Sequence, residues 1–245
     1  LAIYKTLEYL KKKKKKKLVI TETGCGASTL ALFLHCALNG NKMFSWDING
    51  SKGSILKSII NESICNFIEV DINKVWTFVP FYSTDKHVGL SMLKEMRLKA
   101  DFCFFDSWHT LEHVMSEIRE YEKISPKDSF ILAFDDSYYT KKKLNYVYIN
   151  IIRTKLGLNK ATEPANNISK HFYIEIENYL KKKYKKVLKI KDYYKANYKN
   201  DDWFKYYKEV KDFGISSYEK KFSLKDLREK KNIIMHRFDA FEVKK

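Results

Sequence analysis

The stretch from Leu18 to Leu30, LVITETGCGASTL, constrains the fold more than any other part of the chain. Its first three residues are β-forming and apolar, as in a buried parallel strand, and Ser28 to Leu38 has the apolar content of a helix packed on a sheet. Gly24 and Gly26 allow the backbone to turn sharply and to approach a ligand closely, while the following helix N-terminus supplies amide donors. The stretch predicts a strand, a nucleotide-binding turn and a helix. The alternative is the same unit without a ligand.

The glycine turn alone does not choose the ligand. A dinucleotide fingerprint requires G-x-G-x-x-G, and Thr29 occupies the position of the third glycine. Glu22 precedes the turn, and a second acidic residue, Asp47, follows the next expected strand, Met43 to Trp46. An E-x-G-x-G turn with an acidic strand end about twenty residues later resembles motif I of class I S-adenosylmethionine (SAM) methyltransferases.

This resemblance implies SAM as the cofactor. In that family the glycine loop holds the methionine part of SAM, and the acid after the second strand binds the ribose hydroxyls. The cofactor-binding residues implied here are Glu22, Gly24, Gly26, Ser28 and Asp47.

The composition fits one sizeable core with an appended lobe, since 44% of the 245 residues are hydrophobic. The cysteines form no C-x-x-C pair and no metal-binding spacing, so we expect free thiols in a reducing compartment, the cytoplasm. The longest apolar stretch, Leu30 to Leu38, is far shorter than the roughly 20 residues that span a bilayer, so no membrane span is expected. The four cysteines are Cys25, Cys36, Cys65 and Cys103.

The net charge of +17 is unevenly distributed along the chain. Residues 1–140 carry 19 basic and 17 acidic side chains, a balance of +2, whereas residues 141–245 carry 28 and 13, a balance of +15. Only five of the 47 basic residues are arginine, the preferred reader of guanine edges and phosphate forks. We interpret the charge as a solvated face. A surface for an anionic ligand such as nucleic acid is the alternative.

The first residues combine a helical pattern with a lysine run. Ala2 to Leu10 has apolar residues at helical spacing and leads into Lys11 to Lys17. Cationic side chains suit a helix C-terminus, although neighbouring charges of one sign repel each other. We expect the run to be the solvated end of the helix and its link to the first strand. A tether to nucleic acid or to an anionic membrane is the alternative.

Acidic residues also follow two later strands. A buried strand, FCFF, ends at Asp106, and the helix Leu111 to Ile124 crosses back over the sheet. A further strand, Phe130 to Phe134, ends at Asp135 and Asp136. Because ligands bind at the carboxyl edge of open α/β sheets, these three carboxylates are expected near Glu22 and Asp47.

Clustered carboxylates repel one another unless a cation or a proton lies among them, and oxygen ligands suit Mg²⁺. Asp106, Asp135 and Asp136 therefore predict an open magnesium site. His109, at the start of the crossover helix, faces the same edge and could take a proton from a substrate hydroxyl. The alternative is that the acids cap helices and His109 makes a structural hydrogen bond. His113, one turn later, is expected to pack.

This region carries the more specific motif, D-S-x-H-x-x-x-H-V-x-x-E-x-x-x-Y, followed by an acidic pair. It resembles the cephalosporin hydroxylase family and is similar to metal-dependent macrolide-sugar and rhamnosyl O-methyltransferases. The resemblance implies that the first Asp and the acidic pair, Asp106, Asp135 and Asp136, bind magnesium, and that His109 acts as the base beside Asp106. The motif residues are Asp106, Ser107, His109, His113, Val114, Glu117 and Tyr121.

The predicted fold is a Rossmann-like seven-stranded SAM methyltransferase sheet with helices on both faces and a basic C-terminal cap. Residues 1–140 form the SAM-binding core. Residues 141–245 complete the sheet and add a lysine- and aromatic-rich cap to the same domain, in which Asp192 to Tyr218 could contact substrate or a second copy of the chain. Asp85 is expected to cap a helix starting near Val88. The other expected elements are helices at Gly53–Ile64, Leu90–Leu98, Leu144–Leu156 and Ser169–Tyr184, and strands at Trp76–Tyr82, Val187–Ile190 and Ile233–Phe241.

The predicted function is SAM-dependent, metal-assisted O-methylation of a sugar or another small polyhydroxylated acceptor. Two alternatives remain open. One is a nucleic-acid (RNA) methyltransferase that docks through the basic C-terminal part, and the other is a SAM-fold binding protein without transferase activity.

Overall fold

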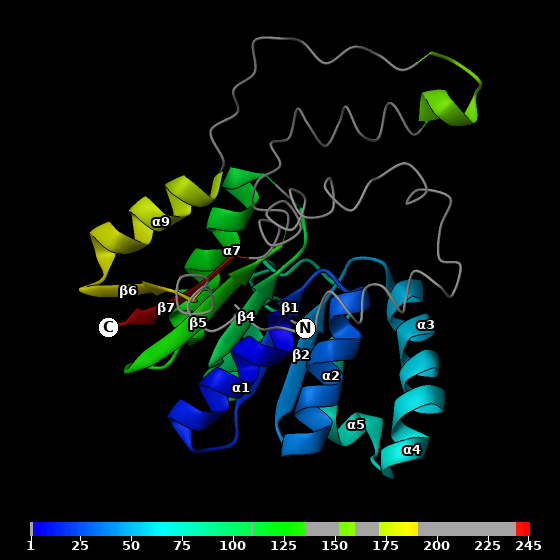
Figure 1. The fold of residues 1–245 in the computed structure, drawn as a ribbon, viewed down its shortest axis with the longest axis horizontal. Coiled ribbons are helices and arrows are strands. Elements are labelled where there is room, and N and C mark those ends of the chain that lie inside the picture. Colours follow the sequence, from blue (N-terminus) through cyan, green and yellow to red (C-terminus); the bar gives the residue numbers. More distant parts are fainter. Residues whose placement is uncertain (1, 109, 136–151, 160–171, 191–238) are drawn as a thin grey trace, which may run out of the picture.

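In the computed structural model, seven strands of the described residues form one sheet in the order β3-β2-β1-β4-β5-β7-β6 (Figure 1). The first five strands run parallel, and β7 runs antiparallel to both of its neighbours. The structure describes residues 2–108, 110–135, 152–159, 172–190 and 239–245. The strands are β1 Val19–Thr23, β2 Lys42–Trp46, β3 Trp76–Val79, β4 Phe102–Phe105, β5 Ser129–Phe134, β6 Lys186–Lys189 and β7 Asp239–Lys244.

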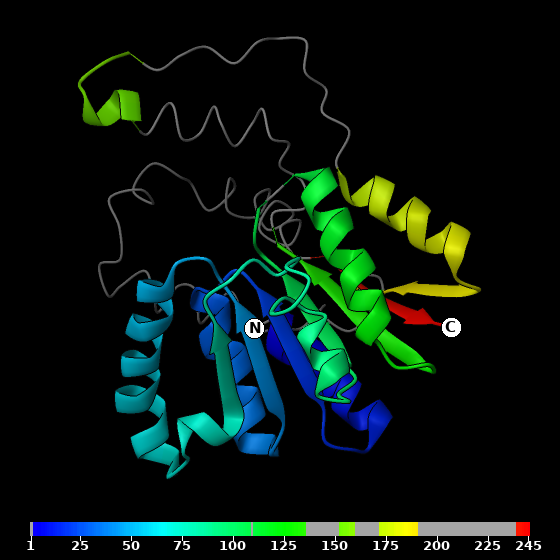
Figure 2. The same ribbon diagram turned by 180° about the vertical axis from the view of Figure 1, so that it is seen from behind.

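Helices cover both faces of this sheet, which confirms the predicted fold class. Helices α1 and α2 lie in front of the sheet in Figure 1, and α7 lies in front of it in Figure 2. Side chains of α6, α7 and α9 share one core cluster, and side chains of α1, α2, α3 and α5 share the other. The bounds are α1 Ala2–Lys14, α2 Ala27–Asn39, α3 Gly50–Ile60, the π-helical turn η1 Asn61–Cys65, α4 Asn66–Ile68, α5 Ile72–Val75, α6 Met92–Glu95, α7 Leu111–Ile124 and α9 Phe172–Lys183.

Strand β4 is apolar throughout because both faces of the sheet are covered. Phe102 and Phe104 point to the cluster under α1 and α2, whereas Cys103 and Phe105 point to the cluster under α7. All four side chains are buried. Successive side chains of a strand point to opposite faces, so a parallel strand covered on both faces needs a continuous apolar run.

Several expected bounds shift where local turn chemistry takes over. Strand β3 ends before Pro80, earlier than expected. The helix expected to start near Val88 begins only at Met92, and Asp85 caps the preceding turn instead, with its Oδ1 accepting hydrogen bonds from the amides of His87 (2.8 Å) and Val88 (3.0 Å). Helix α6 is much shorter than the expected Leu90–Leu98. Helix α3 begins earlier than expected, after the N-cap residue Asn49.

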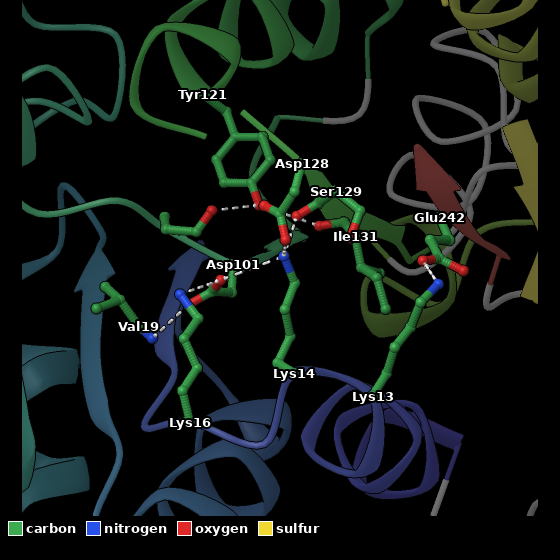
Figure 3. Close-up of polar contacts among 11 residues, drawn as sticks. Lys13, Lys14, Lys16, Val19, Asp101, Tyr121, Asp128, Ser129, Ile131 and Glu242 are labelled. Atoms are coloured by element: carbon green, nitrogen blue, oxygen red, sulfur yellow. Dashed lines mark hydrogen bonds and ion pairs between the residues drawn. The ribbon is translucent and has the colours of Figure 1, made fainter. Parts of the chain in front are cut away.

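Six of the seven lysines in the run are exposed, as predicted for a solvated helix end, but the prediction is wrong for Lys14, whose side chain is mostly buried. Helix α1 continues to Lys14, whose Nζ lies 2.5 Å from Asp128 Oδ2 and 2.7 Å from the Ser129 carbonyl oxygen (Figure 3). The ammonium group of Lys16 lies 2.9 Å from Asp101. Lys13 pairs with Glu242 of β7 (Figure 3).

Buried acids explain two of these ion pairs, those of Lys16 and Lys13. Asp101 and Glu242 are almost completely buried, and a buried carboxylate without a partner is strongly destabilising. Asp101 also accepts a hydrogen bond from the Val19 amide at 3.2 Å, and Glu242 accepts one from the Tyr9 hydroxyl at 2.7 Å. Lys13 and Lys14 therefore fasten the end of α1 to β7 and to the start of β5. Lys16, in the link from α1 to β1, pairs with Asp101 just before β4, at the edge of the sheet opposite the predicted site.

The second half of the chain contributes β6, shifted by one residue from its predicted position, and β7, which shares only Asp239–Phe241 with the predicted strand Ile233–Phe241. Helix α9 lies within the predicted Ser169–Tyr184 helix. Most of the Leu144–Leu156 helix and the whole Asp192–Tyr218 segment lie outside the described residues. All four cysteines are free and buried, which confirms the prediction of unpaired thiols. Within the described part of the chain, no helix is both long and apolar enough to cross a membrane.

Candidate functional site

The sheet has a topological switch point between β1 and β4. From β1 the chain proceeds to β2 and β3 on one side, and it then continues with β4 and β5 on the other side. Loops that leave neighbouring strands in opposite directions open a crevice at the carboxyl edge, where open α/β sheets bind ligands. The glycine turn follows β1, Asp47 follows β2, Asp106 follows β4 and Asp135 follows β5. The strand order thus brings these predicted site residues to one edge.

Gly24 and Gly26 have different roles in the turn. Gly24 has φ +83°, and a Cβ atom there would lie 2.0 Å from the carbonyl oxygen of Asp106. Its amide donates to the Trp46 carbonyl oxygen at 2.7 Å. Gly26 is extended, and a Cβ atom there would meet no atom of the described residues within 4 Å. The turn is therefore packed tightly at Gly24 and borders open space at Gly26.

Glu22 is fully buried beneath the turn, and its carboxylate accepts three side-chain hydrogen bonds. The donors are the hydroxyls of Ser28 (2.6 Å), Thr29 (2.8 Å) and Ser45 (3.1 Å). The Thr29 hydroxyl also accepts a hydrogen bond from the Gly26 amide at 2.9 Å. Glu22 and Ser28, both predicted to bind the cofactor, thus bind each other and hold the turn to the start of α2. Thr29, which replaces the third glycine, completes this support.

Burial raises the pKa of Glu22 to about 7, although the three hydroxyl donors and the positive charge of Lys52 act in the opposite direction. A carboxyl group removed from water favours its neutral form. Glu22 therefore retains its proton in the folded chain over a pH range in which the unfolded chain has lost it.

This shift predicts a pH-dependent stability. The folded chain binds more protons than the unfolded chain between pH 4.5 and about 7, so the contribution of Glu22 to stability falls as pH rises through this window. Between pH 4.5 and about 7, the free energy of unfolding of the wild type is expected to fall by about 3 kcal/mol relative to that of Glu22→Gln. The reason is that one pKa unit corresponds to about 1.4 kcal/mol. Urea unfolding at several pH values measures the difference. Glu62→Gln, at an exposed position, is the control. Parallel curves for wild type and Glu22→Gln would show that the pKa of Glu22 is not raised.

Asp47 presents an ionised carboxylate at the end of β2. Its Oδ1 accepts a hydrogen bond from the Asn49 amide at 2.9 Å, and its Oδ2 accepts from the Cys25 amide at 2.9 Å and from Lys52 Nζ at 2.8 Å. Partial burial opposes ionisation, but the hydrogen bonds from Lys52, Asn49 and Cys25 outweigh it and lower the pKa of Asp47. The bond to Cys25 joins the loop after β2 to the glycine turn.

Lys52 was not identified from the sequence. Its side chain is partly exposed and pairs with Asp47 from the first turn of α3. A positive charge near a helix N-terminus is unfavourable with respect to the helix dipole. A lysine at this position, five residues after Asp47, is the signal that could have revealed the pair.

Two of the three acids predicted to bind metal, Asp106 and Asp135, lie next to each other. Phe105 and Phe134 are paired in neighbouring strands, so the residues that follow them, Asp106 and Asp135, are neighbours at the carboxyl edge. The Asp106 amide donates to the Thr23 carbonyl oxygen at 2.8 Å, and the Asp135 amide donates to that of Phe105 at 3.1 Å.

Two members of the predicted set, His109 and Asp136, lie outside the described residues. Among the residues that are described, no group of three or more His, Cys, Asp and Glu side chains could hold a metal ion. The magnesium site and the base therefore stay predictions.

Large apolar side chains are exposed in the loops at this edge. Ile48 follows Asp47, Phe81 and Tyr82 follow β3, and Trp108 follows Asp106. Exposed apolar side chains next to polar groups are typical of ligand-binding surfaces. The edge therefore combines hydrogen-bonding groups with apolar contact surface.

These features place the chain in the Rossmann-like fold class to which the SAM methyltransferases belong, with its candidate site at the β1/β4 switch point. No protein-family model matches the sequence, and neither does any curated protein.

The chain is similar to solved methyltransferase structures. The plantazolicin methyltransferase BpumL, in complex with SAH, has a TM-score of 0.46 at 10% identity, over 99% of this chain and 82% of that chain. CalS11, a TDP-rhamnose 3'-O-methyltransferase of calicheamicin biosynthesis, has a TM-score of 0.44 at 16% identity, over 68% of this chain and 75% of that chain. An O-methyltransferase from Bacillus cereus, in complex with SAH, has a TM-score of 0.40 at 16% identity, over 57% of each chain.

Proposed function

We propose that this chain is a SAM-dependent O-methyltransferase that acts on a sugar or another small polyhydroxylated acceptor. The observation that carries the proposal is the ionised carboxylate of Asp47, which is hydrogen-bonded to the backbone of a glycine turn at the switch point. Residues 1–140 contain the residues proposed for both sides of the site, and β6 and β7 belong to the same sheet, so we treat the chain as one domain.

The residues at this edge fit the parts of SAM. A carboxylate has about four lone-pair sites, and Oδ1 of Asp47 accepts one hydrogen bond from a described donor, which leaves acceptor capacity for a ribose hydroxyl. The open space at Gly26 allows the methionine part to approach the backbone at the start of α2. The exposed side chain of Ile48 offers apolar surface for the adenine ring of SAM. Glu22 is buried, so we assign it the role of supporting the turn.

Lys52 and the ribose compete for Asp47. Oδ2 already accepts from the Cys25 amide and from the Lys52 ammonium group, so a second ribose hydroxyl would have to replace Lys52. The Lys52 side chain is partly exposed and can move into solvent. We therefore expect SAM to bind with Lys52 displaced from Asp47.

The acceptor side combines described and predicted residues. Asp106 and Asp135 supply oxygen ligands of the kind that Mg²⁺ prefers, and Asp136 is the third ligand that the sequence resemblance implies. Bound there, the metal ion would lower the pKa of an acceptor hydroxyl, while SAM supplies the electrophilic methyl group. His109 is proposed to remove the proton from that hydroxyl. General base catalysis contributes roughly 10²- to 10⁴-fold, so positioning of the acceptor must supply much of the remaining acceleration.

Transfer of labelled methyl groups tests this proposal. The chain is incubated with methyl-labelled SAM and a panel of free and nucleotide-linked sugars, with Mg²⁺ or with chelator, and RNA serves as a competing acceptor. Label is expected on a sugar hydroxyl, with at least about a hundredfold loss of turnover for His109→Ala and little change in SAM affinity.

Three outcomes would contradict parts of the proposal. Label on RNA instead of sugar would show that the acceptor is a nucleic acid. Near-normal turnover of His109→Ala would show that His109 is not the base. Intact turnover of Asp136→Asn in chelator would show that no metal ion is needed.

A further inference from the structure

Helix α7 carries a buried acid on its otherwise apolar inner face. Val114, Ile118, Tyr121 and Ile124 pack into the core beneath the helix, and Glu117 lies among them with no exposed surface. A buried charge is costly unless it is paired and hydrogen-bonded. Glu117 therefore requires a reason beyond packing, because a leucine would suit the pattern of this face better.

The partners of Glu117 come from three different segments. Its Oε1 accepts hydrogen bonds from the Ser83 hydroxyl, in the loop after β3, and from the Ser107 hydroxyl at 2.8 Å, in the loop after β4. His113 Nε2, one turn earlier on α7, lies 3.3 Å from the same oxygen. The hydrogen bond to Glu117 raises the pKa of His113. His113 was expected only to pack, and the structure instead pairs it with an acid.

These two loops belong to opposite sides of the switch point. Ser107 directly follows Asp106. The loop after β3 is closed by a hydrogen bond from the Leu90 amide to the Ser83 carbonyl oxygen, at 2.7 Å. In the same loop, the Val88 carbonyl oxygen accepts a hydrogen bond from the Trp46 indole, at 2.8 Å. Trp46 immediately precedes Asp47. Glu117 thus connects the loop after β3, which contacts the cofactor side of the site, to the loop after β4, which contains the residues proposed for the acceptor side.

The second oxygen of Glu117 strengthens the case against a packing role. Oε2 is buried and has no hydrogen-bond partner among the described residues. An unsatisfied buried acceptor is destabilising, and replacing a buried polar group by an apolar one of similar shape is often neutral or stabilising. Glu117 therefore contributes less to the stability of the fold than an apolar residue of similar shape would.

We propose that Glu117, paired with His113, is a positioning residue for methyl transfer: it holds the segment that begins at Asp106 against the loop after β3 and so sets the acceptor side of the site relative to the cofactor side. This inference rests on the proposed function. Glu117 acts through Ser83 and Ser107 and is not itself expected to touch the substrate.

Hydrogen exchange of the full-length chain tests the inference without an acceptor. The variants are Glu117→Leu, which removes the hydrogen bonds, and Glu117→Gln, whose amide oxygen still accepts from both serines. Glu120→Gln is the matched control, because Glu120 lies on the same helix and pairs only with Lys123 among the described residues, at 2.6 Å. Peptides covering residues 80–90 and 105–110 are followed by mass spectrometry, together with thermal unfolding and calorimetric titration of SAM.

In Glu117→Leu we expect exchange in these two peptides to rise at least about tenfold, with an unchanged or higher Tm, because local opening is separate from global unfolding. Glu117→Gln is expected to restore protection close to the wild type, and Glu120→Gln to change nothing. SAM affinity should change less than about threefold in every variant, since Asp47 and the glycine turn are untouched.

Two results would overturn the inference. Unchanged exchange in Glu117→Leu would show that the serine bonds do not hold the loops. A lower Tm with faster exchange throughout the chain would identify Glu117 as part of the packing alone. Failure of the proposed function is separate, since it would appear as absence of SAM binding in the wild type whatever the loops do.

Discussion

Replacing Gly24 by alanine is expected to be one of the most destabilising single substitutions in the chain. Gly24 has φ +83°, a conformation that costs a residue with a side chain about 1–3 kcal/mol. The added Cβ would also lie 2.0 Å from the carbonyl oxygen and 2.6 Å from the carbonyl carbon of Asp106, both backbone atoms. The turn or the end of β4 would have to move. We expect a loss of about 4 kcal/mol or more in the free energy of unfolding, measured by urea denaturation.

Gly26→Ala is the matched control for this substitution. Gly26 is extended, and a Cβ atom there meets no described atom within 4 Å, so stability is expected to change by less than about 0.5 kcal/mol. The methyl group would enter the space assigned to SAM, so Gly26→Ala should weaken SAM binding while the chain stays folded. Equal stability loss in both variants, or stability unchanged in Gly24→Ala, would contradict the geometry of the turn.

Asp47→Asn is expected to have the largest effect on cofactor binding. The substitution removes the negative charge that attracts the ribose hydroxyls and leaves an amide donor facing the Cys25 amide and Lys52. Hydrogen bonds to charged groups contribute about 1.5–3 kcal/mol, so SAM affinity should fall roughly 10- to 150-fold. Calorimetric titration of the folded variant measures the change.

Two companion variants define what Asp47 does. Asp71→Asn also changes an acid that accepts a backbone hydrogen bond, from the Asn73 amide at 2.9 Å, but it lies before β3 at the other edge of the sheet, and no effect on SAM is expected. Lys52→Met removes the competitor for Asp47 and a positive charge near a cationic ligand, so SAM should bind about threefold more tightly. Weaker binding by Lys52→Met would show that Lys52 contacts SAM instead of competing with it.

The sheet and its site edge were predictable because their signals are local. Strand β4 and residues Phe130–Phe134 of β5 are apolar runs bounded by polar residues, and α7 has the bounds that its apolar periodicity predicted, Leu111–Ile124. Once the strands are known to be parallel, their carboxyl ends must meet at one edge. The positions of Asp47, Asp106 and Asp135 at that edge follow from this rule.

The ion pairs of the lysine run and the burial of Lys14 were not predicted, because the partners are distant in the sequence. Lys13 and Lys14 look like an exposed charged tail until Glu242 and Asp128 are brought beside them. Nothing in a local pattern indicates that an acid 229 residues away is buried and requires a cation. Tertiary context overrides the usual interpretation of a charge run as a solvated face.

The partners of Glu117 were hidden for the same reason. The sequence shows an acid in an apolar helical stripe, which is a visible anomaly, and His113 one turn before it. Ser83 lies 34 residues away, in a loop whose course depends on where β3 ends. The sequence could therefore flag Glu117 as unusual but could not show that it connects two loops.

The measurement that tests the central claim most directly is calorimetric titration of the purified chain with SAM, in matched buffers with Mg²⁺ and with chelator, and with NAD⁺ as the competing nucleotide. We expect saturable SAM binding in the micromolar range that is weakened roughly 10- to 150-fold in Asp47→Asn. We expect no binding of NAD⁺, because Thr29 replaces the third glycine of the dinucleotide fingerprint. Absence of SAM binding in both buffers, or tighter binding of NAD⁺ than of SAM, would contradict it.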